Sequence, residues 1–252
     1  ATYHNEASGT DSVLDVDKIW YTFPVTDKVT ATVGPKIENY YMLAATPSIY
    51  KPKALKAFRF GGHGIAFGAS TSVGAGVKYV GDNGFASSVT VNSKGGASTT
   101  GILTDADDSK INTQLAYTAD NYHVSATYTT QNKGFTGGYP YFSTAGAKQS
   151  GVKTDGWALR AWWRPNEEGT AVPTVSVGYD TVSYNTTATG KFKSGEGYSI
   201  GLNWSDMFQA DDTIGIALGQ PIKGTDKVGG GSDTDPFLWE VYYSFKPNDS
   251  IE

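Results

Sequence analysis

Few side chains in this sequence have the types and spacing that catalysis requires. The three histidines, His4, His63 and His123, lie far apart, and the sequence has no HExxH motif and no second histidine at metal-binding spacing. It has no cysteine, which excludes disulfides, thiolate metal sites and cysteine nucleophiles. We therefore expect a protein that is not an enzyme and that uses no metal and no cofactor.

Two acidic clusters could carry other chemistry. Asp105, Asp107 and Asp108 could bind Ca²⁺, but they lack the spacing of an EF-hand loop, so a solvated acidic loop is the simpler interpretation. Glu167 and Glu168 could form the carboxylate pair of a glycosidase, but they stand in a short turn beside a proline and a glycine. We interpret both clusters as solvent-exposed surface residues.

Solute selectivity makes smaller demands, because it needs only charged side chains along a water-filled lumen. The sequence has three arginines, Arg59, Arg160 and Arg164. One hypothesis is a cationic strip built on these arginines and faced by acidic side chains; the alternative is that each cation pairs with a local carboxylate. The candidate pore-lining and constriction residues are Arg59, His63, Lys78, Arg160, Arg164, Asp180 and Glu240.

Strands must present these side chains on one face, and period-two alternation dominates the sequence. In one run Trp157, Leu159 and Trp163 point one way while Arg160 points the other. Each run has about 9–11 residues, the length that a tilted strand needs to cross a bilayer. Eleven runs are predicted, at 13–23, 28–37, 72–80, 85–93, 110–118, 121–131, 155–163, 172–182, 196–204, 212–220 and 236–246.

The two faces of these runs differ as they do in membrane barrels. The apolar face often carries aromatic residues at its ends, such as Tyr122 and Tyr128, whereas the other face is rich in Gly, Ser, Thr and Asn. We expect an all-β fold, an antiparallel transmembrane β-barrel of the porin type with a wet interior. A β-sandwich also has one polar face per strand, so a secreted sandwich that binds carbohydrate is the alternative.

The connectors between the runs are predicted to alternate between short and long through the whole chain, as they do in outer-membrane barrels. The longest, 38–71, contains Phe58 and Phe67, which need a place to be buried. We expect this loop to fold into the lumen and to bring Arg59 and His63 near a constriction. The alternative is an ordered loop packed on the rim.

Composition agrees with this interpretation. The chain has 252 residues and a net charge of -5, which argues against a nucleic-acid partner. No apolar run approaches the roughly 20 residues of a membrane helix. We expect one β-barrel domain over 1–252.

Five segments, in chain order, resemble the Som-type outer-membrane porins of cyanobacteria, which are related to the carbohydrate-selective OprB family. The most specific part is the Trp-Ser-Asp-Met-Phe turn and the Gly-Gln-Pro strand exit within 197–221. The segments are DKIWYTFPVTDKVTATVGP at 17–35, SVGAGVKYVGDNGFASSVTV at 72–91, NTQLAYTADNYHVSATYTTQN at 112–132, GYSIGLNWSDMFQADDTIGIALGQP at 197–221 and TDPFLWEVYYSFKPNDSIE at 234–252.

This resemblance implies passive diffusion of small hydrophilic solutes or inorganic ions across the cell outer membrane, with membrane lipid as a partner and a homotrimer as one assembly. It also implies a complete barrel of 14–16 strands. The sequence has no S-layer-homology domain, which the family carries, and Ser250-Ile251-Glu252 look like the start of another strand. We therefore expect the barrel portion to be incomplete at one or both ends.

Overall fold

The described residues form one antiparallel sheet of eleven strands. The computed structural model describes residues 16–50, 52, 55, 57–62, 64–67, 71–95, 104, 107–132, 149, 151–167, 169 and 171–246. Each strand pairs with the next in sequence order, from β1 to β11. The strands are β1 (Ile19–Pro24), β2 (Val29–Glu38), β3 (Thr71–Val80), β4 (Phe85–Ser93), β5 (Ser109–Thr118), β6 (Tyr122–Gln131), β7 (Thr154–Trp163), β8 (Thr174–Tyr184), β9 (Phe192–Ser205), β10 (Thr213–Lys227) and β11 (Leu238–Ser244).

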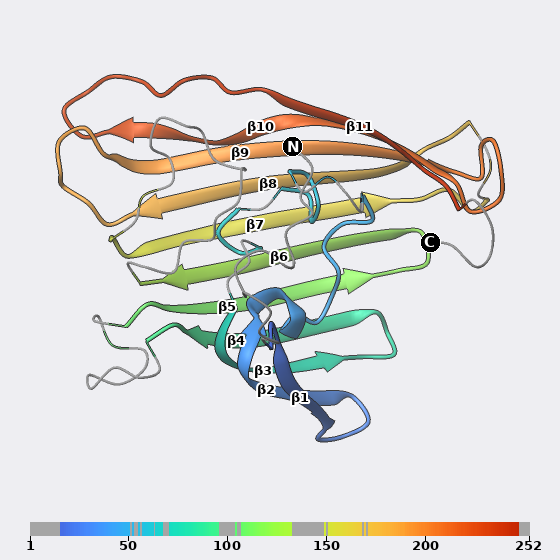
Figure 1. The fold of residues 1–252 in the computed structure, drawn as a ribbon, viewed down its shortest axis with the longest axis horizontal. Coiled ribbons are helices and arrows are strands. Elements are labelled where there is room, and N and C mark those ends of the chain that lie inside the picture. The colour runs from blue at the N-terminus through green and yellow to red at the C-terminus, as the bar shows by residue number, and fades with distance from the viewer. Residues whose placement is uncertain are drawn as a thin grey trace.

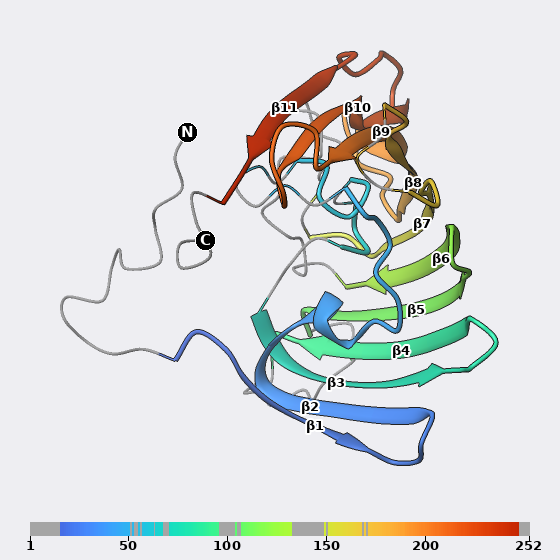
Figure 2. The same cartoon turned by 90° about the vertical axis from the view of Figure 1, so that its right-hand side faces the viewer.

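The sheet is strongly curved and has the form of an open barrel. Its strands lie side by side in Figure 1, and Figure 2 shows the sheet curling from β1 around to β11. The two end strands do not pair with each other, so the sheet is not closed. The all-β antiparallel prediction is confirmed, and the two-sheet sandwich alternative is wrong for the described strands, because they form one sheet.

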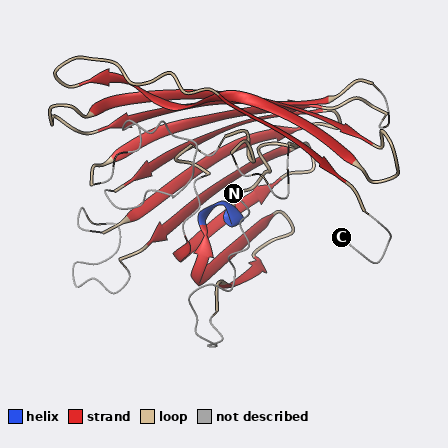
Figure 3. Ribbon diagram, turned by 45° about the horizontal axis from the view of Figure 1, so that its top comes forward, coloured by secondary structure: helices blue, strands red, loops and turns tan. Residues whose placement is uncertain are grey.

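Strands account for nearly all the regular structure in Figure 3, where the 3-10 helix η1 (Asn39–Met42) is drawn in blue. No helix in the described part of the chain is both long and apolar enough to span a bilayer.

The alternation predicted from the sequence separates an outer from an inner face. In β7 the side chains of Trp157, Leu159 and Trp163 are exposed, whereas Ala158 and Arg160 are buried. Strands β5, β6 and β8 repeat this pattern because consecutive side chains of a strand point to opposite sides. The concave side therefore carries the predicted polar face.

The predicted length alternation of the connectors is wrong in the second half of the chain. The expected long connectors at 183–195 and 221–235 are shorter, because β9 begins at Phe192 and β10 continues to Lys227. Pairing extends through Lys223↔Glu196 and Gly224↔Gly195, with irregular register on either side. As a result, the β8–β9 connector 185–191 is no longer than the turn 206–212.

The turn 206–212 between β9 and β10 is organised by the carboxylate of Asp212. Its Oδ1 accepts a hydrogen bond from the Met207 amide at 2.8 Å, and its Oδ2 accepts from the amides of Phe208 at 2.9 Å and Gln209 at 3.2 Å. The Tyr243 hydroxyl of β11 donates to the same Oδ2 at 3.1 Å. Burial raises the pKa of the Asp212 carboxyl, but these four bonds outweigh it and lower the net pKa below 3.8.

We predict that Asp212→Asn lowers the urea midpoint of unfolding, because an amide nitrogen cannot accept the bonds that one carboxylate oxygen accepts. Since the folded pKa is depressed, the carboxylate stabilises the fold above the unfolded pKa of about 3.8, and this contribution disappears as the pH falls through the folded pKa. The stability of Asp212→Asn should therefore fall less than that of wild type as the pH is lowered through the folded pKa of Asp212. The exposed Asp82→Asn is the control; equal acid profiles for Asp212→Asn and wild type would contradict the prediction.

Candidate functional site

The described part of the long connector between β2 and β3 lies against the concave face of the sheet, as Figure 2 shows. Glycines on the inner face make room for it. A Cβ atom at Gly201 would lie 2.7 Å from the ring of Tyr50, and one at Gly219 would lie 3.0 Å from the ring of Phe58. The expectation that loop 38–71 folds into the lumen is therefore confirmed for its described residues, and none of those between Glu38 and Thr71 forms a strand.

Apolar packing holds this loop in place. Tyr50, Phe58 and Ile65 are buried against an apolar patch of the inner wall that includes Val182 and Ile222. Full burial of a large apolar side chain contributes about 1.5–3 kcal/mol. The inner wall thus offers the loop an apolar patch in addition to polar side chains such as Asn203, whose Nδ2 donates to the Ile49 carbonyl at 3.2 Å.

A buried ion pair adds directional bonds to this packing. Nη2 of Arg160 on β7 lies 2.9 Å from both carboxylate oxygens of Asp180 on β8, and the side chains are 0% and 2% exposed. The register pairs Ala158 with Asp180, so Arg160 and Asp180 are diagonal neighbours on one face.

The same guanidinium binds the loop. Nε of Arg160 donates to the Phe60 carbonyl at 2.6 Å, and Nη2 donates to the Gly62 carbonyl at 2.9 Å. The backbone of Phe60, Gly61 and Gly62 is in the left-handed region, with φ of 79°, 69° and 95°. This tight turn directs the carbonyls at the arginine, so Arg160 joins two strands to the loop.

The predicted cationic strip is therefore wrong at Arg160. Its side chain points inward as predicted, but the loop covers it and Asp180 neutralises it, which corresponds to the alternative of local pairing. Arg164 is exposed at the strand end, where its Nε donates to the Asp120 carbonyl at 2.8 Å. It also borders a hollow of about 290 Å³ that includes Thr174 and Asn203.

The other predicted pore-lining residues differ in their burial and in their contacts with the loop. Glu240 is on the inner face beside Tyr50 and the backbone of Phe58, so it also faces the loop. Arg59 is half-buried in the loop, with its guanidinium carbon 5.2 Å from the centroid of the Phe60 ring. Lys78 is half-buried on the inner face of β3. His63 lies outside the described residues.

The described residues offer no arrangement typical of a catalytic or metal site. The segment 197–201, Gly-Tyr-Ser-Ile-Gly, matches the spacing of a nucleophile elbow, but Ser199 stands in the middle of β9 and not at a strand-to-helix turn. His123 stacks on Trp162, and its Nδ1 lies 2.7 Å from the Thr118 hydroxyl. Within the described ranges, no three His, Cys, Asp or Glu side chains gather as a metal site would need.

The structure also contains an aromatic cluster that the sequence does not predict. Tyr40 of η1 joins Phe60 and Phe67 of the loop in an aromatic cluster, with ring centroids 4.9 Å apart for Tyr40 and Phe60 and 5.9 Å apart for Phe60 and Phe67. The burial of Phe67 was expected, but the sequence carries no periodic signal that brings Tyr40 to it.

Comparisons with known proteins do not assign a family. No protein-family model matches the chain, and a search of curated proteins finds no match either. The resemblance to Som-type porins therefore stays a prediction.

We predict that Arg160→Gln lowers the free energy of unfolding by about 3–5 kcal/mol, because Asp180 is left buried without its partner. The double variant Arg160→Met with Asp180→Leu should recover part of this loss, because it removes both charges. Urea titration followed by tryptophan fluorescence measures both effects. The exposed Arg164→Gln is the control and should change stability by less than about 0.5 kcal/mol. An equally small effect of Arg160→Gln would contradict the anchoring role.

Proposed function

We propose that the protein is an outer-membrane porin that lets small hydrophilic solutes or inorganic ions diffuse passively through a water-filled pore. The observation that carries this proposal is the apolar outer face of the sheet. Each strand from β2 to β11 contributes an exposed aliphatic side chain to it: Val33, Val77, Val89, Leu115, Val124, Leu159, Val177, Ile200, Ile216 and Val241.

An apolar surface that extends over ten neighbouring strands is unusual on a water-soluble monomer. Hydrocarbon chains would cover it without cost, whereas the inner face is rich in serines, threonines and asparagines. The two faces together favour a membrane wall over a soluble carbohydrate-binding protein.

Aromatic residues at the strand ends support the same proposal. Phe85, Tyr117 and Tyr122 form a row on β4, β5 and β6 beside the short turns, with ring centroids 6.4 Å and 6.0 Å apart. Trp163 is paired in register with Tyr122 and extends the row to β7. Such rings favour the interface between hydrocarbon and water.

A pore in lipid also needs its sheet edges paired. The outer edges of β1 and β11 have no neighbour among the described strands, and each unpaired backbone group in hydrocarbon costs several kcal/mol. The proposal therefore requires further strands or another pairing at these edges, in agreement with a barrel of 14–16 strands. A homotrimer is a proposed assembly that the resemblance alone suggests.

The size of the interior spaces supports the proposal of small solutes. The loop occupies part of the concave space and leaves hollows of a few hundred Å³, such as the one of about 290 Å³ beside Arg164. Because Arg160 is neutralised by Asp180, Lys78 is the better candidate for a lumen charge that acts on ions.

We predict that the purified full chain, reconstituted in planar bilayers, gives stepwise conductance, and that Lys78→Glu shifts the reversal potential in a KCl gradient toward cation preference. A charge reversal beside a narrow lumen changes local ion concentrations, whereas the same change at Lys28, in an exposed turn, should have little effect. Absence of any conductance from wild type would refute the porin proposal. Equal shifts for the two variants would refute the role of Lys78.

A further inference from the structure

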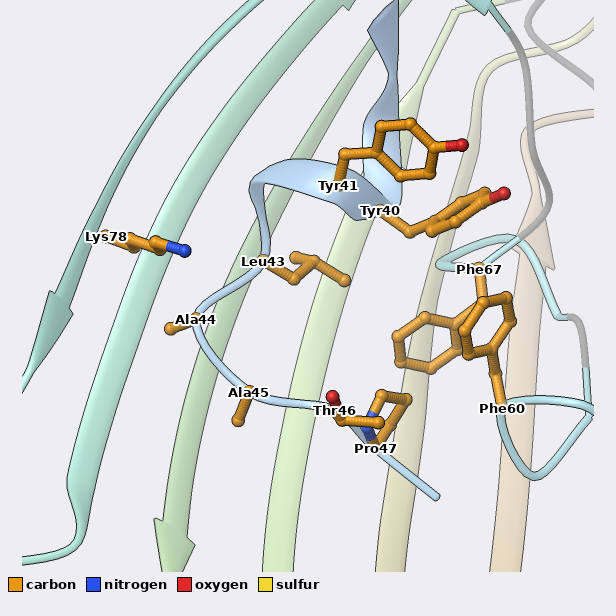
Figure 4. Close-up of a pocket in the computed structure, with 10 residues that line it drawn as sticks. All are labelled: Tyr40, Tyr41, Leu43, Ala44, Ala45, Thr46, Pro47, Phe60, Phe67 and Lys78. Carbon is orange, nitrogen blue, oxygen red and sulfur yellow. The ribbon is translucent and has the colours of Figure 1, made fainter. Parts of the chain in front are cut away.

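A pocket between the loop and β3 combines apolar rings with one cation. Its volume is about 260 Å³, and its lining includes Tyr40, Leu43, Phe60, Phe67 and Lys78. Figure 4 shows the aromatic rings on one side of the space and the Lys78 side chain reaching toward it from the other, with the segment 43–47 between them.

The aromatic side of this pocket is built in a fixed arrangement. Phe60 and Phe67 are inclined at 30° to each other, and Tyr40 and Phe60 at 51°. Phe67 is fully buried, and the guanidinium carbon of Arg160 lies 5.0 Å from its ring centroid. The anchor that fixes the loop therefore also fixes the ring wall.

The cationic side is a lysine that makes no ion pair with any described residue. Lys78 is on the inner face, between the exposed Val77 and Tyr79. The described residues that line the pocket include no carboxylate. Arg59, next to Phe60, adds a second positive charge on the loop side. The local charge is thus positive and can be balanced by a solute.

An apolar ring wall opposite one ammonium group is complementary to a small anion with a planar apolar body. A ring can stack or pack edge-on against Phe60 and Tyr40, and a carboxylate can pair with Lys78. At about 30 Å³ per water molecule, a pocket of about 260 Å³ has room for a solute of benzoate size. A simple inorganic anion would use the ammonium group alone, and a neutral ring would use the aromatic side alone.

We propose that this pocket is a binding subsite for small aromatic carboxylates, an inference that rests on the proposed porin function and names a solute class for it. Lys78 binds the carboxylate, Tyr40 and Phe60 bind the ring, and the buried Phe67 supports Phe60.

Calorimetric titration of the full chain in detergent micelles tests the subsite, with benzoate, acetate and benzyl alcohol as probes. Wild type should bind benzoate at least tenfold more tightly than either other probe. Lys78→Gln should weaken benzoate at least tenfold and leave benzyl alcohol unchanged, while Lys78→Arg should retain benzoate. Phe60→Leu should weaken benzoate, and Lys28→Gln should match wild type.

No benzoate binding by wild type, or equal binding by wild type and Lys78→Gln, would overturn the inference. Planar-bilayer conductance, measured on the same preparations, separates the two proposals. Conductance without benzoate binding would refute the subsite alone, and benzoate binding without conductance would refute the porin proposal alone.

Discussion

The structure depends on one constraint, the alternation of side chains along paired antiparallel strands. Each strand bonds its backbone to its neighbours and so must present one row of side chains to each side of a single sheet. In this chain one row is aliphatic and aromatic from β2 to β11, and the other is mostly polar, with an apolar patch that includes Val182 and Ile222. The apolar row is on the convex side, where no other part of the described chain covers it. The proposed porin function depends on lipid hydrocarbon covering that side.

The concave side is under a different constraint, because the long β2–β3 connector must fit inside the curved sheet. Small residues on the wall let the loop approach closely, as at Gly178, where an added Cβ atom would collide with the Gly61 carbonyl. The buried Arg160 then satisfies loop carbonyls that would otherwise be unpaired away from water. Packing and hydrogen bonding thus cooperate to make the loop part of the wall, and the space left over is divided into small hollows with distinct linings.

Much of this could be predicted from the sequence, because alternation is a local signal. The predicted run at 155–163 became β7 at Thr154–Trp163, and parity alone placed Arg160, Asp180 and Glu240 on the inner face. The extra length of β9 and β10 was missed, because glycines such as Gly195 and Gly224 pair in the sheet without contributing an alternating side chain.

The partners of the inner charges could not be predicted in the same way. The Arg160 to Asp180 contact requires the register of β7 and β8, and the contact with Phe60 joins residues one hundred positions apart. The odd or even position of a residue along a strand shows whether its side chain points inward, but not whether a loop lies above it. For that reason Lys78 and Arg160 look equivalent in the sequence, although only Arg160 is fully covered and paired.

The central claim is that lipid hydrocarbon covers the convex face. Variants that retain one tryptophan, either Trp157 on the outer face or Trp162 on the inner face, can be reconstituted in vesicles whose acyl chains carry bromine. Trp157 is 50% exposed and Trp162 is 8% exposed and stacked on His123. The account predicts strong quenching of Trp157 fluorescence and little quenching of Trp162. Equal quenching of both, or a chain that stays in solution with neither quenched, would contradict it.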